Sequence, residues 1–309
     1  MKNFAAPLGI LAWIVSAVLA AQQRPQLFTF HSNDWLNLHH YIRSVARGAP
    51  GPGGLTPSEQ KEWAEGVTFY KPYAARDVLR DDGMVAIASA LRAGEGKSNL
   101  DGVAIDPALK AMLERLMPIY RMRAWTEHDR ANREWIATIV PLVDRHGAPI
   151  SRSITRAYGV TWPREPMHVD LSVVAGPVGA FSVNNHITIS SFDPSYRGHA
   201  GLEMVFHEAS HGLGVFAALI QPLNQIAAVQ KVTVPPQLWH AVLFYTAGEM
   251  TTRELKAHGI EYSPYANAAF YDNLCGPGCV ARIREHWTPR LDGKRSVADA
   301  LSPLVAAFR

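Results

Sequence analysis

Residues 204–214 read MVFHEASHGLG, and this stretch decides how the rest of the sequence is interpreted. His207 and His211 stand four positions apart, and Glu208 directly follows the first histidine. Side chains four apart on a helix share one face, so both imidazoles can reach one zinc ion about 2 Å away. Glu208 is rotated by about 100° and can act on a nearby water as a general base. The stretch therefore predicts a helical zinc site with His207 and His211 as ligands.

The residues around the motif indicate that its helix is buried. Met204 and Phe206 precede the motif, and Val215 and Leu219 follow it. The alternative is an ordinary helix that carries its histidines and glutamate as a solvent-facing stripe. The apolar flanks argue against that alternative, because a buried charged glutamate is costly unless it is paired or faces a cleft.

The other segments predict an α+β fold that is predominantly helical. Apolar residues at alternate positions from Met167 to Val173 indicate a half-buried strand, and strand character continues from Phe181 to Ser191. Everything after His199 has helical spacing. A small sheet therefore precedes the motif helix.

Helical segments fill the sequence before this sheet. Thr56, Pro57 and Glu59 form a strong helix start, with a capping box between Thr56 and Glu59. Further helices are expected over 31–47, from Asp106-Pro107 to about residue 121, and over 125–146, where Pro141 predicts a kink or a break.

The N-terminus has the pattern of a secretory signal peptide. Lys2 supplies a positive charge, residues 4–20 are apolar or small, and a cut is expected near Ala20 or Ala21. An uncleaved membrane anchor is the alternative, but the stretch is short for a span and Pro7 interrupts it. We therefore expect a signal peptide over 1–21, a helical region over 22–150 and a catalytic region over 151–309.

Composition restricts the partners and the compartment. The chain of 309 residues has a formal net charge of only +3 and no Lys/Arg-rich block, which disfavours nucleic-acid binding. After signal cleavage no membrane association is expected. Cys275 and Cys279 flank a Gly-Pro-Gly turn, and in an oxidising compartment we expect them to form a local disulfide rather than half of a zinc site.

The motif resembles the signature of the zincin metallopeptidases, H-E-x-x-H. The resemblance covers the motif helix, the strand before it and one later helix. It implies zinc bound by His207 and His211, Glu208 as general base, and a helix packed beneath a small sheet whose edge strand holds the substrate.

Zincins differ in their third ligand. The metzincin pattern continues to a third histidine, but that position is Ala217 here. The gluzincin pattern takes a glutamate from a later helix, and Glu249 in the apolar segment 239–255 is our expected third ligand. The alternative is an ion pair between Glu249 and Arg253, four residues on. Glu203, Glu254 and Asp272 are weaker candidates for the third ligand.

A hydrolytic site also needs a donor for the developing oxyanion. Tyr245 is the first candidate because it precedes Glu249 by one helical turn, and His240 and His186 follow in that order.

Together these features predict a secreted or periplasmic zinc-dependent hydrolase that acts on peptides or proteins. Two alternatives remain open at this point: a non-catalytic exported zinc-containing binding protein, and a zinc hydrolase of non-peptide amides.

Overall fold

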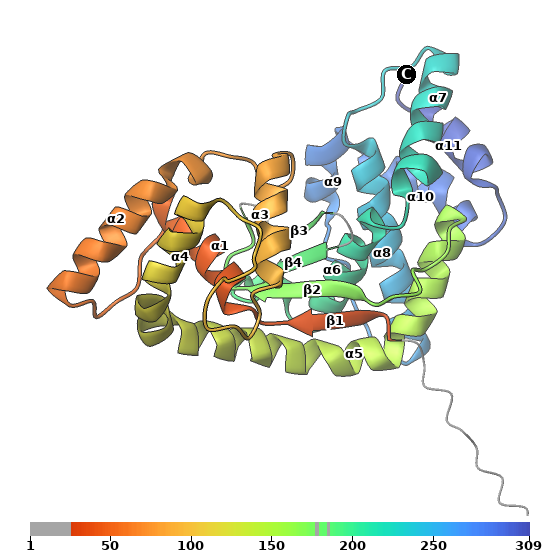
Figure 1. Ribbon diagram of the computed structural model, residues 1–309. Helices are drawn as coiled ribbons and strands as arrows, with labels where there is room; N and C mark the ends of the chain where they lie inside the picture. The colour runs from red at the N-terminus through yellow and green to blue at the C-terminus, as the bar shows by residue number, and fades with distance from the viewer. Residues whose placement is uncertain (1–25, 177–178, 184–185) are drawn as a thin grey trace, which may run out of the picture.

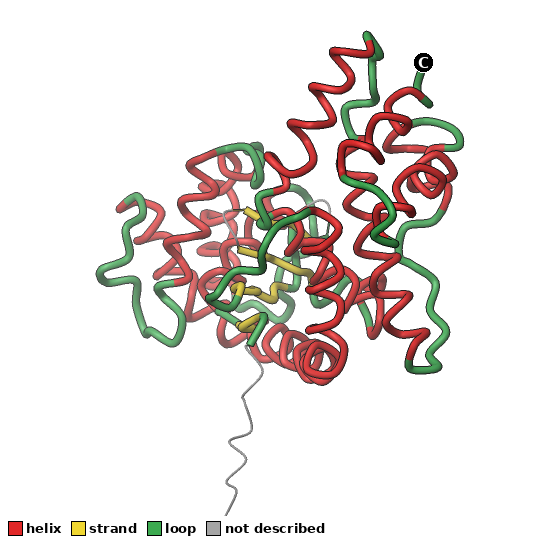
Figure 2. Tube along the Cα trace, turned by 90° about the vertical axis from the view of Figure 1, so that its right-hand side faces the viewer, coloured by secondary structure: helices red, strands yellow, loops and turns green. Residues whose placement is uncertain are grey.

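A four-stranded mixed sheet lies at the centre of the computed structural model, surrounded by helices (Figures 1 and 2). The structure describes residues 26–176, 179–183 and 186–309, so the expected signal peptide lies outside the described residues. The strand order is β1-β2-β4-β3, with β1, β2 and β4 parallel and β3 antiparallel at one edge. The strands are β1 (Phe28–His31), β2 (Met167–Ser172), β3 (Ala180–Val183) and β4 (His186–Ser190).

The sheet differs from the sequence prediction in two ways. The strand character expected over 181–191 is confirmed, but it is divided between two antiparallel strands, β3 and β4. The short strand β1 was not predicted, and it brings the N-terminal region into the same sheet.

Helices cover both faces of the sheet, so β2 is more buried than the alternating pattern suggests. Its polar residues Asp170 and Ser172 are 2% and 0% exposed. The Asn37 side chain donates to the Leu171 carbonyl oxygen at 2.8 Å and accepts from the Val173 N–H at 3.1 Å. These bonds fix α1 against the polar face, which explains why that face is not exposed to solvent.

The N-terminal helices lie together at one end of the sheet (Figure 1) and share a hydrophobic core, to which Phe181 of β3 also belongs. The predicted capping box is confirmed, since Glu59 N–H donates to the Thr56 hydroxyl while Thr56 N–H donates to the Glu59 carboxylate. The expected helix after Asp106 is also confirmed. The helices of this part are α1 (Asp34–Ala46), α2 (Pro57–Ala74), α3 (Asp82–Arg92) and α4 (Pro107–Tyr120), followed by the π-helical turn η1 (Arg121–Trp125).

A long helix, α5 (Thr126–Tyr158), runs beneath the sheet and along much of the molecule (Figure 1). It continues through Pro141, so the break considered there does not occur. Residue 150, expected as a boundary between two regions, lies inside α5. Helix α5 spans residue 150, and β1 from before it pairs with β2 from after it. The two expected regions are therefore parts of one structural unit.

The C-terminal half is helical, as the sequence predicts, and it shares a second hydrophobic core with α5 and the sheet. A disulfide joins Cys275 to Cys279, confirming the expected pair. Among the described residues no single helix has the length and apolar composition of a membrane span; one pair of helices, bent by 79°, passes that test only when taken together. The elements are η3 (Pro194–Tyr196), α6 (Gly198–His211), η4 (Phe216–Ile220), α7 (Gln221–Gln230), α8 (Leu238–Ala257), α9 (Ala268–Cys275), α10 (Cys279–Leu291) and α11 (Val297–Ala306).

Candidate metal centre

Helix α6 carries the HEASH motif and ends at His211, its last residue. Residues 201–210 are all buried, because α6 packs against α5, α8 and the edge strand β3. Leu202, Val205 and Phe206 belong to the larger hydrophobic core. The predicted buried motif helix is thus present, and its position is fixed on several sides.

Three imidazoles converge at the end of this helix. His211 Nε2 lies 3.4 Å from His207 Nε2, and His240 Nε2 lies 3.3 Å from the same nitrogen. His240 comes from the first turn of α8, which packs beside α6. Ligand atoms about 2.05 Å from a tetrahedral zinc are about 3.3 Å apart, so these separations fit one ion held by all three nitrogens.

Aromatic rings shape this group of histidines. The Phe244 ring stacks on His207 with centroids 3.6 Å apart, and Trp239 stacks on His240 with centroids 5.1 Å apart. His207 is only 1% exposed, whereas His211 and His240 are partly exposed. The rings of Phe244 and Trp239 therefore form an apolar side of the histidine group, and its other side faces solvent.

Burial keeps the three imidazoles neutral. It lowers the pKa of His211 to about 3 and that of His240 to about 4, and it also lowers the pKa of His207. Neutral imidazole is the form that binds a metal ion. His207 Nδ1 is buried without a hydrogen-bond partner among the described residues.

Glu208 faces the edge strand of the sheet. The Ser182 hydroxyl of β3 lies 2.6 Å from Glu208 Oε2 and 2.8 Å from the Glu208 carbonyl oxygen. Burial raises the pKa of the Glu208 carboxyl to about 7, and the hydrogen bond from Ser182 opposes that rise. The carboxylate is thus held between the motif helix and the edge strand.

The structure does not bring Glu249 into this group. Its Oε1 accepts a hydrogen bond of 2.7 Å from Arg253 Nε, and Arg253 also binds Asp292 at 2.8 Å. Among the described residues, the group at the end of α6 that could hold a metal ion consists of His207 and His211 together with His240 of α8. Glu249, the expected third ligand, lies outside this group and instead forms the ion pair with Arg253.

The other expected oxyanion donors also lie elsewhere. The Tyr245 hydroxyl lies 2.8 Å from the Thr288 hydroxyl of α10. His186 Nε2 contacts the Arg92 guanidinium at the start of β4. Of the three candidates, the structure places only His240 beside the motif histidines, in a position from which it could share a metal ion with them.

His240 could have been recognised from the sequence as a candidate ligand. Downstream of the motif the histidines are His240, His258 and His286. His240 sits in an apolar helix, four residues before Phe244, in the same turn relationship that joins the motif histidines. The gluzincin resemblance favours a carboxylate, which is why Glu249 is the expected third ligand and His240 an expected oxyanion donor.

The ligand set suits zinc with a free coordination position. Three imidazoles form a borderline-soft site of the kind that zinc prefers. Structural zinc sites usually have four protein ligands, whereas the described residues supply three here. With two histidines partly exposed, water or substrate can reach the remaining position.

Comparison with known proteins found no matching family model, no similar curated protein and no similar solved structure. The interpretation of this site therefore rests on its residues and geometry.

Proposed function

We propose that the protein is an exported zinc-dependent peptidase with a zincin-like catalytic core. The observation that carries the proposal is the convergence of three imidazole Nε2 atoms, 3.3–3.4 Å from His207 to each neighbour, beside the buried carboxylate of Glu208. Export rests on the signal-peptide pattern of residues 1–21.

His207, His211 and His240 would hold the ion. When bound, zinc supplies Lewis acidity, which activates water as a nucleophile and polarises a substrate carbonyl. The aromatic rings of Phe244 and Trp239 limit the motion of two of these imidazoles, and so keep the ligand geometry fixed.

Glu208 would move the proton. Its carboxylate accepts a proton from the attacking water and passes it to the nitrogen of the departing amine. The bond from Ser182 holds one carboxylate oxygen against β3, which limits the directions in which Glu208 can reach. A peptide substrate suits this arrangement because β3 is the edge strand of the sheet that the described residues form, and extended peptides bind to sheets by pairing with an edge strand.

Replacing Glu208 with glutamine tests the assignment of the base. Glu208→Gln has nearly the same shape but cannot accept the proton, so we expect peptide cleavage to fall by about 10²- to 10⁴-fold. Zinc content should stay at the wild-type level, because the variant leaves all three imidazoles in place. Elemental analysis and a peptide-library assay with and without a chelator give both measurements.

Glu285→Gln is the matched control, since Glu285 is exposed on α10 and should change neither quantity. Unchanged turnover in Glu208→Gln would disprove the role as base. If the wild-type protein holds zinc and cleaves non-peptide amides but no peptide, the result would favour an amidase. Zinc without any hydrolysis would favour a binding protein.

A further inference from the structure

A second group of metal-binding side chains lies near the opposite end of α8 from His240. Glu254 and His258 are one helical turn apart at the C-terminal end of α8, and His146 faces them from α5. His146 Nδ1 lies 3.2 Å from Glu254 Oε1, and His258 Nδ1 lies 3.3 Å from the same oxygen. The three ligand atoms all lie within 4.8 Å of one another.

We propose that His146, Glu254 and His258 bind a second divalent transition-metal ion, with zinc as the best fit. Two imidazole nitrogens and one carboxylate oxygen form a ligand set of the kind that zinc takes. The 3.2 and 3.3 Å separations match the edge of about 3.3 Å expected for a tetrahedral zinc site.

The charge on Glu254 supports this proposal independently. The side chain is only 12% exposed, and among the described residues no Lys or Arg forms an ion pair with it. A nearly buried carboxylate without a Lys or Arg partner lacks a permanent opposite charge, and an uncompensated charge is costly to bury. A divalent cation would supply that charge.

The competing interpretation is a purely hydrogen-bonded group. Glu254 Oε1 would then accept from both Nδ1–H groups, and His258 Nδ1 is also 3.0 Å from the Glu254 carbonyl oxygen. The two interpretations differ in the effect of metal ions. A hydrogen-bonded group is indifferent to zinc, whereas a metal site binds it and is stabilised by it.

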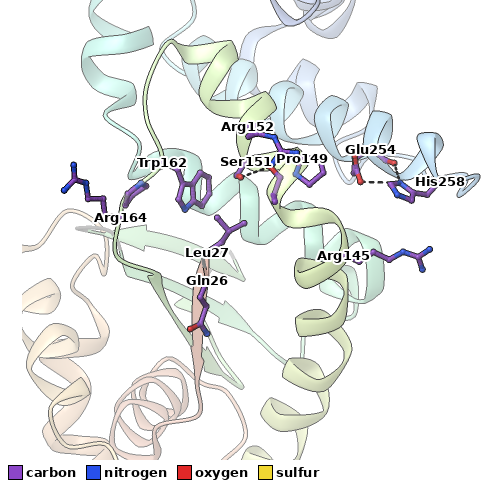
Figure 3. Close-up of a pocket in the computed structure, with 12 residues that line it drawn as sticks. Gln26, Leu27, Arg145, Pro149, Ser151, Arg152, Trp162, Arg164, Glu254 and His258 are labelled. Atoms are coloured by element: carbon purple, nitrogen blue, oxygen red, sulfur yellow. Dashed lines mark hydrogen bonds and ion pairs between the residues drawn. The ribbon is translucent and has the colours of Figure 1, made fainter. Parts of the chain in front are cut away.

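A cavity beside the group leaves room for a further ligand. Its volume is about 860 Å³, and Glu254 and His258 line its edge together with Ser151 and Trp162 (Figure 3). His146 is 1% exposed at its side chain and His258 is 39% exposed, so the site is anchored inside and open outside. Water from the cavity can fill the position that the protein leaves free.

The two sites are separate. Fourteen residues of α8 divide His240 from Glu254, which at 1.5 Å per residue is about 21 Å. Ions at this distance cannot share a ligand, so the second site does not depend on the proposed peptidase function. A metal there would join α5 to the C-terminal end of α8, whose first turn carries His240.

Counting zinc ions per chain tests the proposal. The full protein is loaded with zinc, freed of loosely bound metal on a chelating resin, and measured by elemental analysis. We expect about two zinc ions per wild-type chain and about one in His258→Ala. His258 is partly exposed, so its truncation should leave the fold intact. His286→Ala, a histidine outside both groups, is the control and should keep two.

A second measurement isolates the new site. In His207→Ala/His211→Ala, added zinc should still raise Tm, and the further change Glu254→Gln should abolish that rise. Equal zinc content in wild type and His258→Ala would overturn the proposal, as would a Tm rise that survives Glu254→Gln. If only the site on α6 fails to bind zinc, wild type should still hold about one more zinc ion per chain than His258→Ala. The failure of the proposed function and the failure of this proposal are therefore distinguishable.

Discussion

His240 and Glu249 lie on the same helix, nine residues apart, and only the first lies beside the motif histidines. The reason is rotational: nine residues at about 100° each place the two side chains about 180° apart. Phe244 sits between them in sequence and stacks on His207, which marks the face of α8 that approaches α6. Glu249 therefore reaches Arg253 and not the metal group.

This geometry predicts opposite outcomes for two substitutions. His240→Ala removes one of three ligands and should weaken zinc binding by at least tenfold, because two imidazoles alone leave the ion poorly held. Glu249→Gln should keep wild-type zinc affinity and lower stability by about 0.5 kcal/mol at most, since its ion pair is partly exposed. Zinc titration monitored by calorimetry gives both affinities. Zinc loss in Glu249→Gln with retention in His240→Ala would restore the glutamate as third ligand.

The motif alone allowed the prediction of His207, Glu208 and His211 as neighbours, because a fixed helical spacing determines their relative positions. The proposed third ligand comes from a different helix, and its identity depends on how α6 and α8 pack. Sequence periodicity identifies the buried face of a helix but not its partner. The motif therefore does not reveal that His240, expected as an oxyanion donor, lies beside His207 and His211.

At the level of elements, the packing of α6 against its neighbours depends on a close contact at Gly201. A Cβ added at Gly201 would lie 2.7 Å from Ile139 Cδ1 and 2.7 Å from the Tyr196 carbonyl oxygen. That carbonyl is held in place by a 2.6 Å hydrogen bond from Trp135 Nε1. Gly201 is therefore needed where α6 crosses α5 and η3.

Gly201→Ala should displace α6. Alanine improves helix propensity by about 1 kcal/mol, but the clash with a fixed backbone oxygen costs about 1–3 kcal/mol. The net cost of up to about 2 kcal/mol should lower Tm by up to about 3 °C, with weaker zinc binding because the same helix carries His207. Gly53→Ala is the control, since its added Cβ meets no atom within 4 Å. An unchanged Tm in thermal unfolding would show that α6 adjusts without cost.

Elements with strong local signals were predictable, and those defined by pairing were not. The capping box at Thr56 and Glu59 uses bonds between near neighbours, so the sequence contains all of it. Strand β1 has four residues, too few for a periodic signal, and it is a strand because it pairs with β2. Asp170 looked exposed from the alternation, yet α1 and α3 cover its face.

At the scale of the whole molecule, the helices form two hydrophobic cores on either side of a narrow sheet. The proposed zinc site lies in the larger core, between α6 and α8 and next to β3. Its ligands are therefore held by the same packing that stabilises the fold. A change in a buried charged group on these helices should therefore affect both the free energy of unfolding and the positions of the three histidines.

Glu203 is the buried charge with the clearest consequence for global stability. It lies on α6 one turn before His207, and Oε2 accepts bonds from the Tyr262 hydroxyl at 2.6 Å and the Tyr265 N–H at 3.1 Å. Oε1 is buried without a hydrogen-bond partner among the described residues. Burial raises the pKa of this carboxyl from 4.5 to about 7. The titratable groups that face it, Tyr262 and Tyr271, have pKa values raised further above neutrality and stay uncharged.

A raised carboxyl pKa makes the folded chain bind a proton that the unfolded chain has released. Between about pH 4.5 and pH 7 the contribution of Glu203 to the free energy of unfolding therefore falls as pH rises, by a few kcal/mol in total. Glu203→Gln is neutral at every pH and keeps an oxygen that can accept from Tyr262. The variant should gain stability relative to wild type as pH rises from 5 to 8.

Urea unfolding of both proteins in the presence of a chelator checks this prediction. The contributions of His207, His211, His240 and Glu208 to the pH dependence are common to both proteins and cancel in the difference. Parallel stability curves for the two proteins would show that Glu203 is already ionised in the folded chain at pH 5.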